Sequence, residues 1–171
     1  MPNIVLVGVP GAGKTTVGKL LAEELGRDFF DSDIEIESRA GKSVSDIFTT
    51  DGESVFREIE ADVIAELLQR EDIVLSLGGG SLTNTATREA VKTQLVIWLV
   101  ANLSQAVARV GLNRNRPLLL GNVRGQLADL MQAREPLYVE VATHKVDTSD
   151  LSAEQVVSAI MEIVSGQQEL A

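Results

Sequence analysis

A glycine-rich stretch near the N-terminus has the residue types and the spacing needed to hold phosphate groups: Gly8-Val9-Pro10-Gly11-Ala12-Gly13-Lys14-Thr15. Glycines let consecutive backbone N–H groups point toward an anion, and the N-terminus of a following helix adds positive partial charge. Lys14 can reach the β- and γ-phosphates of a nucleotide, and the hydroxyl of Thr15 can bind Mg²⁺. A plain turn between two elements is the alternative, which the flanking residues disfavour. The stretch therefore predicts nucleotide binding.

The flanking residues supply the strand and the helix that such a loop requires. Residues 4–7 are typical of a buried strand, and residues 16–25 carry apolar side chains along one helical face. Strand-like and helix-like stretches alternate through the rest of the chain, which predicts an α/β domain around a parallel sheet. Further strands are expected at residues 29–30, 73–77, 95–100 and 144–148, and further helices at 34–41, 53–69, 85–92, after Ser104, at 124–141 with an interruption at Pro136, and from the Ser152/Gln155 capping box to Gly166.

Length and composition favour one globular domain with a full core, since the chain has 171 residues of which 44% are hydrophobic and 23% charged. The net charge of −10 argues against a generic nucleic-acid surface, and the absence of cysteine excludes disulfides and thiolate zinc sites. We find no apolar run of membrane-spanning length and no signal-peptide pattern, so we expect a cytoplasmic protein without membrane partners.

Two acids, Asp31 and Asp33, follow a short predicted strand, at the sheet edge where ligands bind in α/β proteins. In an extended segment residues two apart share a face, so one acid could serve Mg²⁺ and the other a substrate hydroxyl. Both could instead simply favour the N-terminus of the next helix. Ser32 with Glu35 forms a capping box, which predicts that this helix begins directly after the strand.

The arginines are unevenly distributed, which suggests a small anionic ligand in a positive cleft rather than a uniformly charged surface. The cluster consists of Arg109, Arg114, Arg116, Arg124 and Arg134. Arg57 lies three residues before Glu60, either as a surface pair or as an arginine aimed at a substrate carboxylate and held by Glu60. The spacing leaves both interpretations open.

Two further segments contain many loop-forming residues. Residues 78–80 are three glycines at the end of a predicted strand, where a backbone without side chains can approach a ligand closely. The two residues before them, Ser76 and Leu77, are not acids, so a metal must rely on Thr15, with Asp31 as the second candidate. Residues 111–122 are too long and irregular for a simple connection, which predicts a mobile lid that carries a cation onto ATP phosphates; disorder without function is the alternative.

Taken together, these motifs closely resemble those of the shikimate kinases, which are related to the nucleoside monophosphate kinases. The resemblance extends from about residue 3 to residue 165. The phosphate-binding loop alone would not single out this family, whereas the joint order of the motifs is highly specific. Besides the loop they are Asp31-Ser32-Asp33, Asp46-Ile47-Phe48, Asp51-Gly52-Glu53, Phe56-Arg57-Glu58, Ser76-Leu77-Gly78-Gly79-Gly80, Arg116-Pro117-Leu118-Leu119 and Arg134-Glu135-Pro136-Leu137-Tyr138.

The resemblance implies a three-layer α/β/α fold with a five-stranded parallel sheet, in a single domain over residues 1–171. The substrate-binding region would lie at about 32–60 and the lid at about 111–122. The implied activity is that of an ATP-dependent transferase, which moves the γ-phosphoryl group of MgATP to the 3-hydroxyl of shikimate. The products are shikimate 3-phosphate and ADP, on the route to chorismate and the aromatic amino acids. We expect a monomer.

The resemblance also implies a role for each matching residue. Three residues would act in catalysis: Lys14, Asp33 as the candidate base, and Arg116 on the lid. Mg²⁺ would be bound by Thr15 and Asp31. ATP would be bound by Gly11, Ala12, Gly13, Lys14, Thr15, Thr16, Arg109 and Arg116. Shikimate would be bound by Asp33, Phe48, Phe56, Arg57, Gly78, Gly79, Gly80 and Arg134. One departure is that residues 148–152 contain no basic residue, whereas family members can carry one there beside the adenine.

Two other functions compete with this interpretation. Arg57 and Arg134 would suit any carboxylate, so a kinase for another small hydroxy acid such as gluconate is one alternative. A guanine-nucleotide switch is the other, because His144-Lys145-Val146-Asp147 loosely resembles the N-K-x-D guanine motif. That stretch has His in place of Asn, and no D-x-x-G follows the strand that ends at Leu77.

Overall fold

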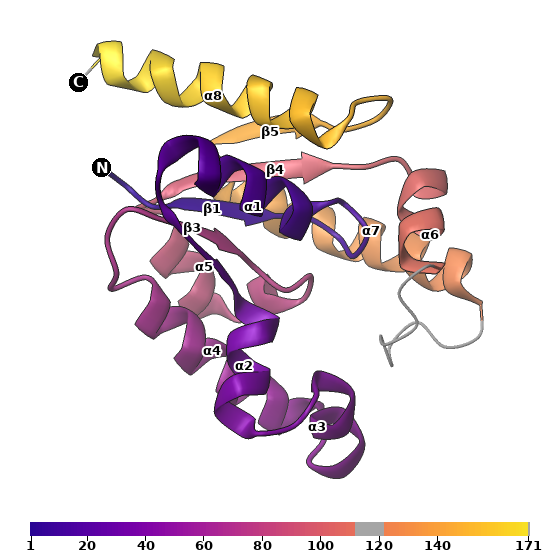
Figure 1. Cartoon of the computed structure of the whole chain (residues 1–171). Helices are drawn as coiled ribbons and strands as arrows, with labels where there is room; N and C mark the ends of the chain where they lie inside the picture. Colours follow the sequence, from indigo (N-terminus) through magenta and orange to yellow (C-terminus); the bar gives the residue numbers. More distant parts are fainter. Residues whose placement is uncertain (112–121, 171) are drawn as a thin grey trace.

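The computed structural model describes residues 1–111 and 122–170 and places five parallel strands in one sheet, in the order β2-β3-β1-β4-β5 (Figure 1). The sheet confirms the predicted fold class. Its strands are β1 (Ile4–Val7), β2 (Asp28–Asp31), β3 (Ile73–Ser76), β4 (Leu95–Val100) and β5 (His144–Asp147).

The five strands differ in how deeply they are buried. The three central strands, β3, β1 and β4, are almost entirely buried, because a parallel sheet with helices on both faces shields them on every side. The edge strands β2 and β5 are partly exposed and carry charged residues. The register pairs Asp31 at the end of β2 with Ser76 at the end of β3, so both residues stand at the carboxyl edge of the sheet.

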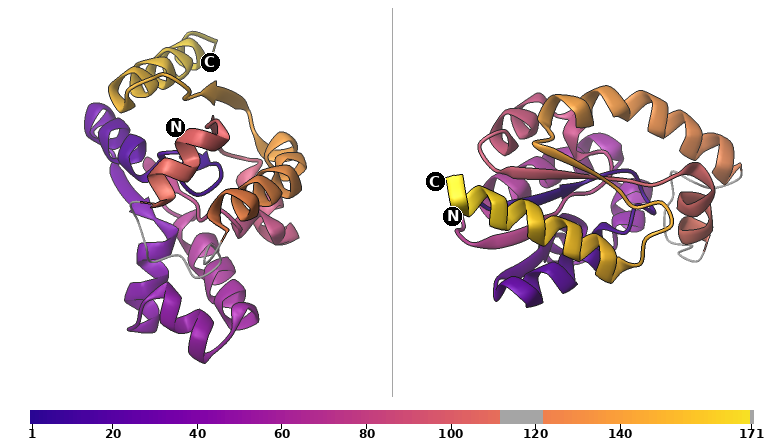
Figure 2. Two further views of the ribbon diagram at one scale, coloured as in Figure 1. Left: turned by 90° about the vertical axis from the view of Figure 1, so that its right-hand side faces the viewer. Right: turned by 90° about the horizontal axis from the view of Figure 1, so that it is seen from above.

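Helices cover both faces of the sheet, and Figure 2 shows α1 and α8 on one side and α5 and α7 on the other. The helices α2, α3 and α4 pack together beyond the β2 edge, and α6 lies past the carboxyl ends of the strands (Figure 1). The bounds are α1 (Lys14–Leu25), α2 (Ser32–Ala40), α3 (Val44–Thr50), α4 (Glu53–Leu67), the short 3₁₀ helix η1 (Ser81–Thr83), α5 (Thr85–Val91), α6 (Leu103–Gly111), α7 (Val123–Val141) and α8 (Ala153–Leu170).

The predicted capping box at Ser32 is wrong. Asp31 caps α2 instead, since its side chain accepts hydrogen bonds from the backbone N–H groups of Asp33 and Ile34 at 2.9 and 3.4 Å. Ser32 is fully buried, and its Oγ accepts a hydrogen bond from the backbone N–H of Gly78 at 2.9 Å. The serine therefore ties α2 to the glycine run rather than closing its own helix.

Three other predicted helix boundaries also differ. The cap of α6 is Asn102, whose Oδ1 accepts from the Gln105 N–H at 2.8 Å, and not Ser104. The helix α7 runs unbroken through Pro136, because buried residues on both sides of the proline hold it against the rest of the protein. The helix α8 continues past Gly166 to Leu170, since a glycine only weakens a helix by about 1 kcal/mol and does not end it by itself.

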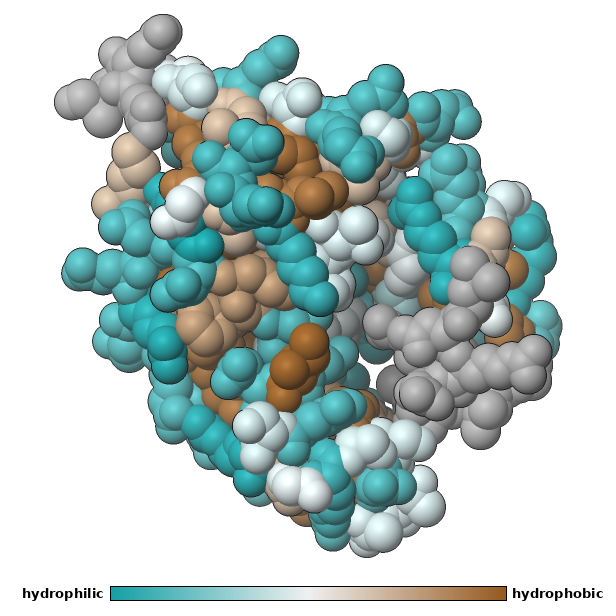
Figure 3. Space-filling model, viewed as in Figure 1, coloured by the Kyte–Doolittle hydropathy of each residue, from teal (hydrophilic) through white to brown (hydrophobic). Residues whose placement is uncertain are grey.

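The surface of the face seen in Figure 1 is mostly hydrophilic, with apolar side chains in separate patches (Figure 3). Within residues 1–111 and 122–170, no helix has both the length and the apolar character needed to cross a membrane.

Candidate active site

The phosphate-binding loop connects β1 to α1 and has a backbone that requires glycine. Gly13 takes φ 93° as the residue that caps α1, a left-handed conformation that side chains disfavour. Gly11 takes φ 82°, and a Cβ added there would lie 2.6 Å from the Ala106 carbonyl oxygen on α6. Ala12 is buried, and its N–H donates to the Val9 carbonyl at 3.1 Å. The loop therefore packs against α6 and leads directly into the N-terminus of α1.

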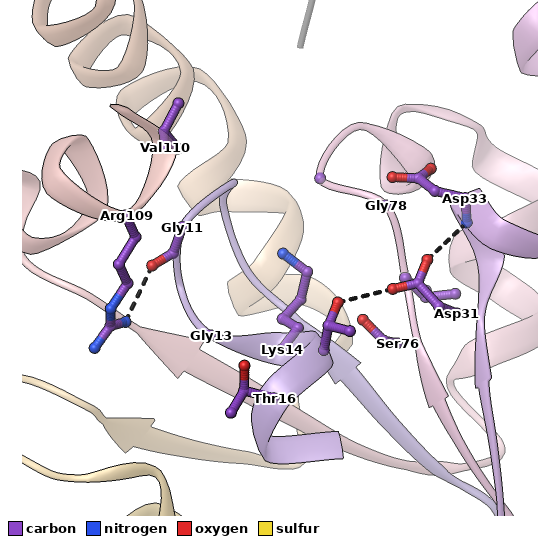
Figure 4. A pocket seen from close by; sticks show the side chains of 13 residues that line it. Gly11, Gly13, Lys14, Thr16, Asp31, Asp33, Ser76, Gly78, Arg109 and Val110 are labelled. Atoms are coloured by element: carbon purple, nitrogen blue, oxygen red, sulfur yellow. Dashed lines mark hydrogen bonds between the residues drawn. The ribbon is translucent and has the colours of Figure 1, made fainter. Parts of the chain in front are cut away.

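Lys14 is the first residue of α1 and is buried, with 8% of its surface exposed. Its ammonium donates to the carbonyl oxygens of Gly8 at 2.8 Å and Val9 at 3.0 Å. Figure 4 shows the side chain reaching into the space between the loop and Asp33. The positive charge is therefore held at the mouth of the loop, where a phosphate group would enter.

Thr15 and Asp31 bring a hydroxyl and a carboxylate together. The Thr15 hydroxyl donates to Asp31 Oδ2 at 2.8 Å, while Asp31 Oδ1 accepts from the Asp33 N–H at 2.9 Å. Such oxygen atoms are the donors that Mg²⁺ prefers, and this metal commonly takes only one or two protein ligands beside phosphates. The described residues contain no group of three or more His, Cys, Asp or Glu residues placed to enclose a metal alone. Thr15 and Asp31 therefore fit a Mg²⁺ ion that takes its other ligands from phosphates.

A cavity of about 210 Å³ lies between the loop and the carboxyl ends of the strands (Figure 4). Arg109 on α6 closes one side, and its Nη1 donates to the Gly11 carbonyl at 3.0 Å. Ten of the predicted site residues line this cavity: Gly11, Gly13, Lys14, Thr15, Thr16, Asp31, Asp33, Gly78, Gly79 and Arg109. The lining also includes Ser76, Leu77 and Val110, which the sequence did not mark as ligand-contacting.

Arg57 and Glu60 form a partly buried ion pair on α4. Arg57 Nη1 donates to Glu60 Oε1 at 2.8 Å, and the Glu60 side chain is only 3% exposed. The Arg57 guanidinium also lies 5.1 Å from the ring centre of Phe56, whose ring packs 4.7 Å from that of Phe48. Arg57 is therefore held by a carboxylate and an aromatic wall, unlike an arginine on an open surface.

The three glycines after β3 bring the remaining predicted residues to one place. A Cβ at Gly78 would lie 2.8 Å from Asp33 Oδ1 and 3.1 Å from Glu60 Oε2. A Cβ at Gly79 would lie 3.3 Å from Arg134 Nη1, and one at Gly80 would overlap the guanidinium of Arg57. Side chains from α2, α4 and α7 thus converge on a backbone that has no side chains of its own.

Arg134 is buried within α7, with 9% of its surface exposed, and burial lowers the pKa of its guanidinium. One turn later Tyr138 donates from its hydroxyl to the Gly79 carbonyl at 3.1 Å. The sequence predicted a role in substrate binding for Arg134 and none for Tyr138. Arg116 and residues 112–121 of the predicted lid lie outside the described residues.

Glu60 is a buried carboxyl group with an unusual affinity for a proton. Burial raises the pKa of Glu60 to about 7, and the nearby Asp33 adds to this effect, while the ion pair with Arg57 opposes it. Among the described residues, Glu60 Oε2 has no hydrogen-bond partner. The carboxyl group therefore titrates near neutral pH inside the cluster of arginines.

Replacing Glu60 by glutamine should remove a pH-dependent part of the free energy of unfolding. The pKa of this group is about 7 when folded and 4.5 as a reference value, so its stabilising contribution is present below about pH 4.5 and is lost as the pH rises through about 7. Glutamine does not titrate, so the variant should not lose this stability as the pH rises. In urea titrations, the difference in free energy of unfolding, variant minus wild type, should therefore increase from about pH 5 to about pH 8. The control is the same substitution at the exposed Glu58 on α4. A difference for Glu60→Gln that stays constant with pH would contradict this assignment.

Comparison with known proteins agrees with the geometry. The shikimate kinase family model matches residues 10–165. The shikimate kinase of Thermobifida fusca is 49% identical over 159 residues, which cover 93% of this chain and 92% of that protein. The shikimate kinase of Mycobacterium tuberculosis is 46% identical over 161 residues, which cover 94% of this chain and 92% of that protein.

Solved structures give the same result. The structure of a shikimate kinase from Acinetobacter baumannii in complex with shikimate has a TM-score of 0.94 and 41% identity, covering 98% of this chain and 94% of that one. The shikimate kinase from Aquifex aeolicus has a TM-score of 0.84 and 30% identity, covering 97% of this chain and 98% of that one. A family match over most of the chain, with relatives at these identities, shows that this protein belongs to the shikimate kinase family.

Proposed function

We propose that the protein transfers the γ-phosphoryl group of ATP to the 3-hydroxyl of shikimate, giving shikimate 3-phosphate and ADP. One observation carries the proposal: the side chains of Asp33, Arg57 and Arg134 converge on residues 78–80. These glycines adjoin the cavity that lies between the phosphate-binding loop and the carboxyl ends of the strands. The shikimate in the related A. baumannii structure supports the choice of acceptor.

On the nucleotide side, the loop amides of residues 11–13 and the N-terminus of α1 would hold the phosphates of ATP, with Thr16 beside them. Lys14 would contact the β- and γ-phosphates, and Arg109 would lie along the adenine. Thr15 and Asp31 would hold Mg²⁺, which supplies positive charge to the phosphate oxygens when bound. Arg116, on the predicted lid, would bring a further positive charge to the transferring group.

On the acceptor side, the two guanidinium groups of Arg57 and Arg134 suit a carboxylate, because each offers several N–H donors in a fixed plane. Phe48 and Phe56 would form the apolar wall, and the backbone of residues 78–80 would contact the ring substituents. Asp33 would hold the reacting hydroxyl and take its proton as the new oxygen–phosphorus bond forms and ADP departs with the electrons of the broken bond.

We also propose that residues 1–171 act as one domain, with the substrate region at about 32–60 and the lid at about 111–122. We further propose that the protein acts as a monomer in the cytoplasm.

The direct test is release of ADP from MgATP by the purified protein with shikimate, compared with gluconate and with no acceptor. We expect ADP release that requires shikimate, together with a product whose mass equals that of shikimate plus one phosphate group. Turnover of gluconate without turnover of shikimate would overturn the proposal in favour of another hydroxy-acid kinase.

Replacing Arg134 by alanine should raise the KM for shikimate by roughly 10- to 100-fold, because a hydrogen-bonded charge pair with the carboxylate is lost. The KM for ATP should change little. Steady-state kinetics with each substrate varied in turn separates the two effects. Arg70→Ala is the control, because it removes an exposed arginine from the loop before β3, at the amino ends of the strands. An effect confined to ATP would argue against the carboxylate assignment.

A further inference from the structure

Tyr138 connects two groups that the proposed function places around the acid substrate. Its hydroxyl is buried and donates to the Gly79 carbonyl at 3.1 Å. Arg134, one helical turn earlier, interacts with it electrostatically, and a Cβ at Gly79 would lie 3.3 Å from Arg134 Nη1. A phenol hydroxyl can donate once and accept through its lone pairs. Because its proton is donated to the Gly79 carbonyl, the hydroxyl presents only its electron-rich oxygen to the neighbouring guanidinium.

The ring of Tyr138 is held by the sheet. It packs against Trp98 of β4 with ring centres 5.5 Å apart, and the Lys145 ammonium lies 4.8 Å from the centre of the Trp98 ring. Burial also raises the pKa of the Tyr138 hydroxyl to about 12, so it remains protonated and able to donate over the whole range in which the enzyme is handled. The position of the hydroxyl is thus set by β4 and β5 rather than by α7 alone.

The helix needs such a support at this point. Pro136 lies between Arg134 and Tyr138 and has no N–H to donate within α7. Arginine has a long side chain that loses several rotamers when it is fixed in one direction. The hydrogen bond from Tyr138 to the Gly79 carbonyl ties this part of α7 to residues 78–80 and so limits where Arg134 can lie relative to them.

We infer that Tyr138 is a positioning residue for the acceptor site: it joins α7, the helix that carries Arg134, to the backbone of Gly79, so that both meet the substrate carboxylate and ring in one fixed arrangement. This inference rests on the proposed function, since it assigns Arg134 to the carboxylate. It adds a residue that acts through Arg134 and need not contact the reacting atoms.

The first test is Tyr138→Phe, which removes the hydroxyl and keeps the ring on Trp98. We expect the KM for shikimate to rise by about 5- to 30-fold, with kcat and the KM for ATP changed by less than about threefold. Val139→Ala is the control, because it changes an exposed residue next to Tyr138 on the same helix; it should leave the KM for shikimate unchanged.

A double-mutant cycle with Arg134→Ala separates positioning from a general structural effect. If Tyr138 acts through Arg134, then Tyr138→Phe should raise the KM for shikimate by less than about twofold when Arg134 is already alanine. Equal effects on both backgrounds would overturn the inference. A wild-type protein that does not phosphorylate shikimate would contradict the proposed function itself, and the inference with it.

A second measurement does not depend on the phenylalanine variant folding well. Tyr138 is the only tyrosine in the chain, so growth with 3-fluorotyrosine labels this position alone. We expect the ¹⁹F resonance to move when shikimate is added, and to stay unchanged when shikimate is added to labelled Arg134→Ala. A resonance that does not respond in a wild-type protein with normal turnover would overturn the inference while leaving the proposed function intact.

Discussion

Replacing Lys14 by alanine should lower kcat by about 10²-fold or more, measured with MgATP and shikimate both saturating. The ammonium is buried at the mouth of the phosphate-binding loop and is directed there by the carbonyls of Gly8 and Val9. Phosphoryl transfer depends on positioning and on neutralising the charge of the transferring group, so a fixed positive charge at this point acts mainly on the transition state.

The matched control is Lys19→Ala, which removes an exposed lysine from the same helix. It should retain nearly full activity. Because Lys14 also bonds to the loop, the melting temperature of Lys14→Ala should be measured beside its kinetics. Turnover close to that of the wild type in a folded Lys14→Ala protein would refute its assigned role.

Replacing Asp33 by asparagine should lower kcat by about 10²- to 10⁴-fold, the range expected when a general base is removed. The cap of α2 should be kept, because the hydrogen bond from Asp33 to Asp31 uses the backbone N–H, which asparagine retains. Asparagine also has nearly the same size as aspartate, which matters where the carboxyl group packs against Gly78.

The control for Asp33 is Asp28→Asn, the same chemical change at the exposed opposite end of β2. We expect this variant to keep the wild-type kcat. If Asp33→Asn retains more than about a tenth of the activity, proton removal by this residue is not required, and orientation of the hydroxyl by neighbouring groups is enough.

The central fold could be predicted because its signals are local. The strands β1, β3 and β4 are continuous apolar runs, and a buried parallel strand has that pattern by necessity. The edge strand β2 was expected to be two residues long and has four, since its outer residues are charged and partly exposed. The capping box of α8 was also confirmed, with Ser152 and Gln155 bonding each other's backbone N–H groups at 2.8 and 3.1 Å.

Several of the failures came where a distant residue decides the outcome. Ser32 fits a local capping pattern, yet its hydroxyl is bonded to Gly78, 46 positions away. Spacing could not decide between the two interpretations of Arg57, because the burial of Glu60 depends on how α4 packs. Tyr138 was missed for the same reason: its partner Gly79 is 59 positions earlier in the chain.

Trp98 is the only tryptophan in the protein, and its ring contacts both the ring of Tyr138 and the ammonium of Lys145. When indole absorption alone is excited, the ultraviolet emission of the molecule therefore originates from this single residue in β4. Titrations and unfolding curves followed by this intrinsic fluorescence will report on one known location, without any attached dye.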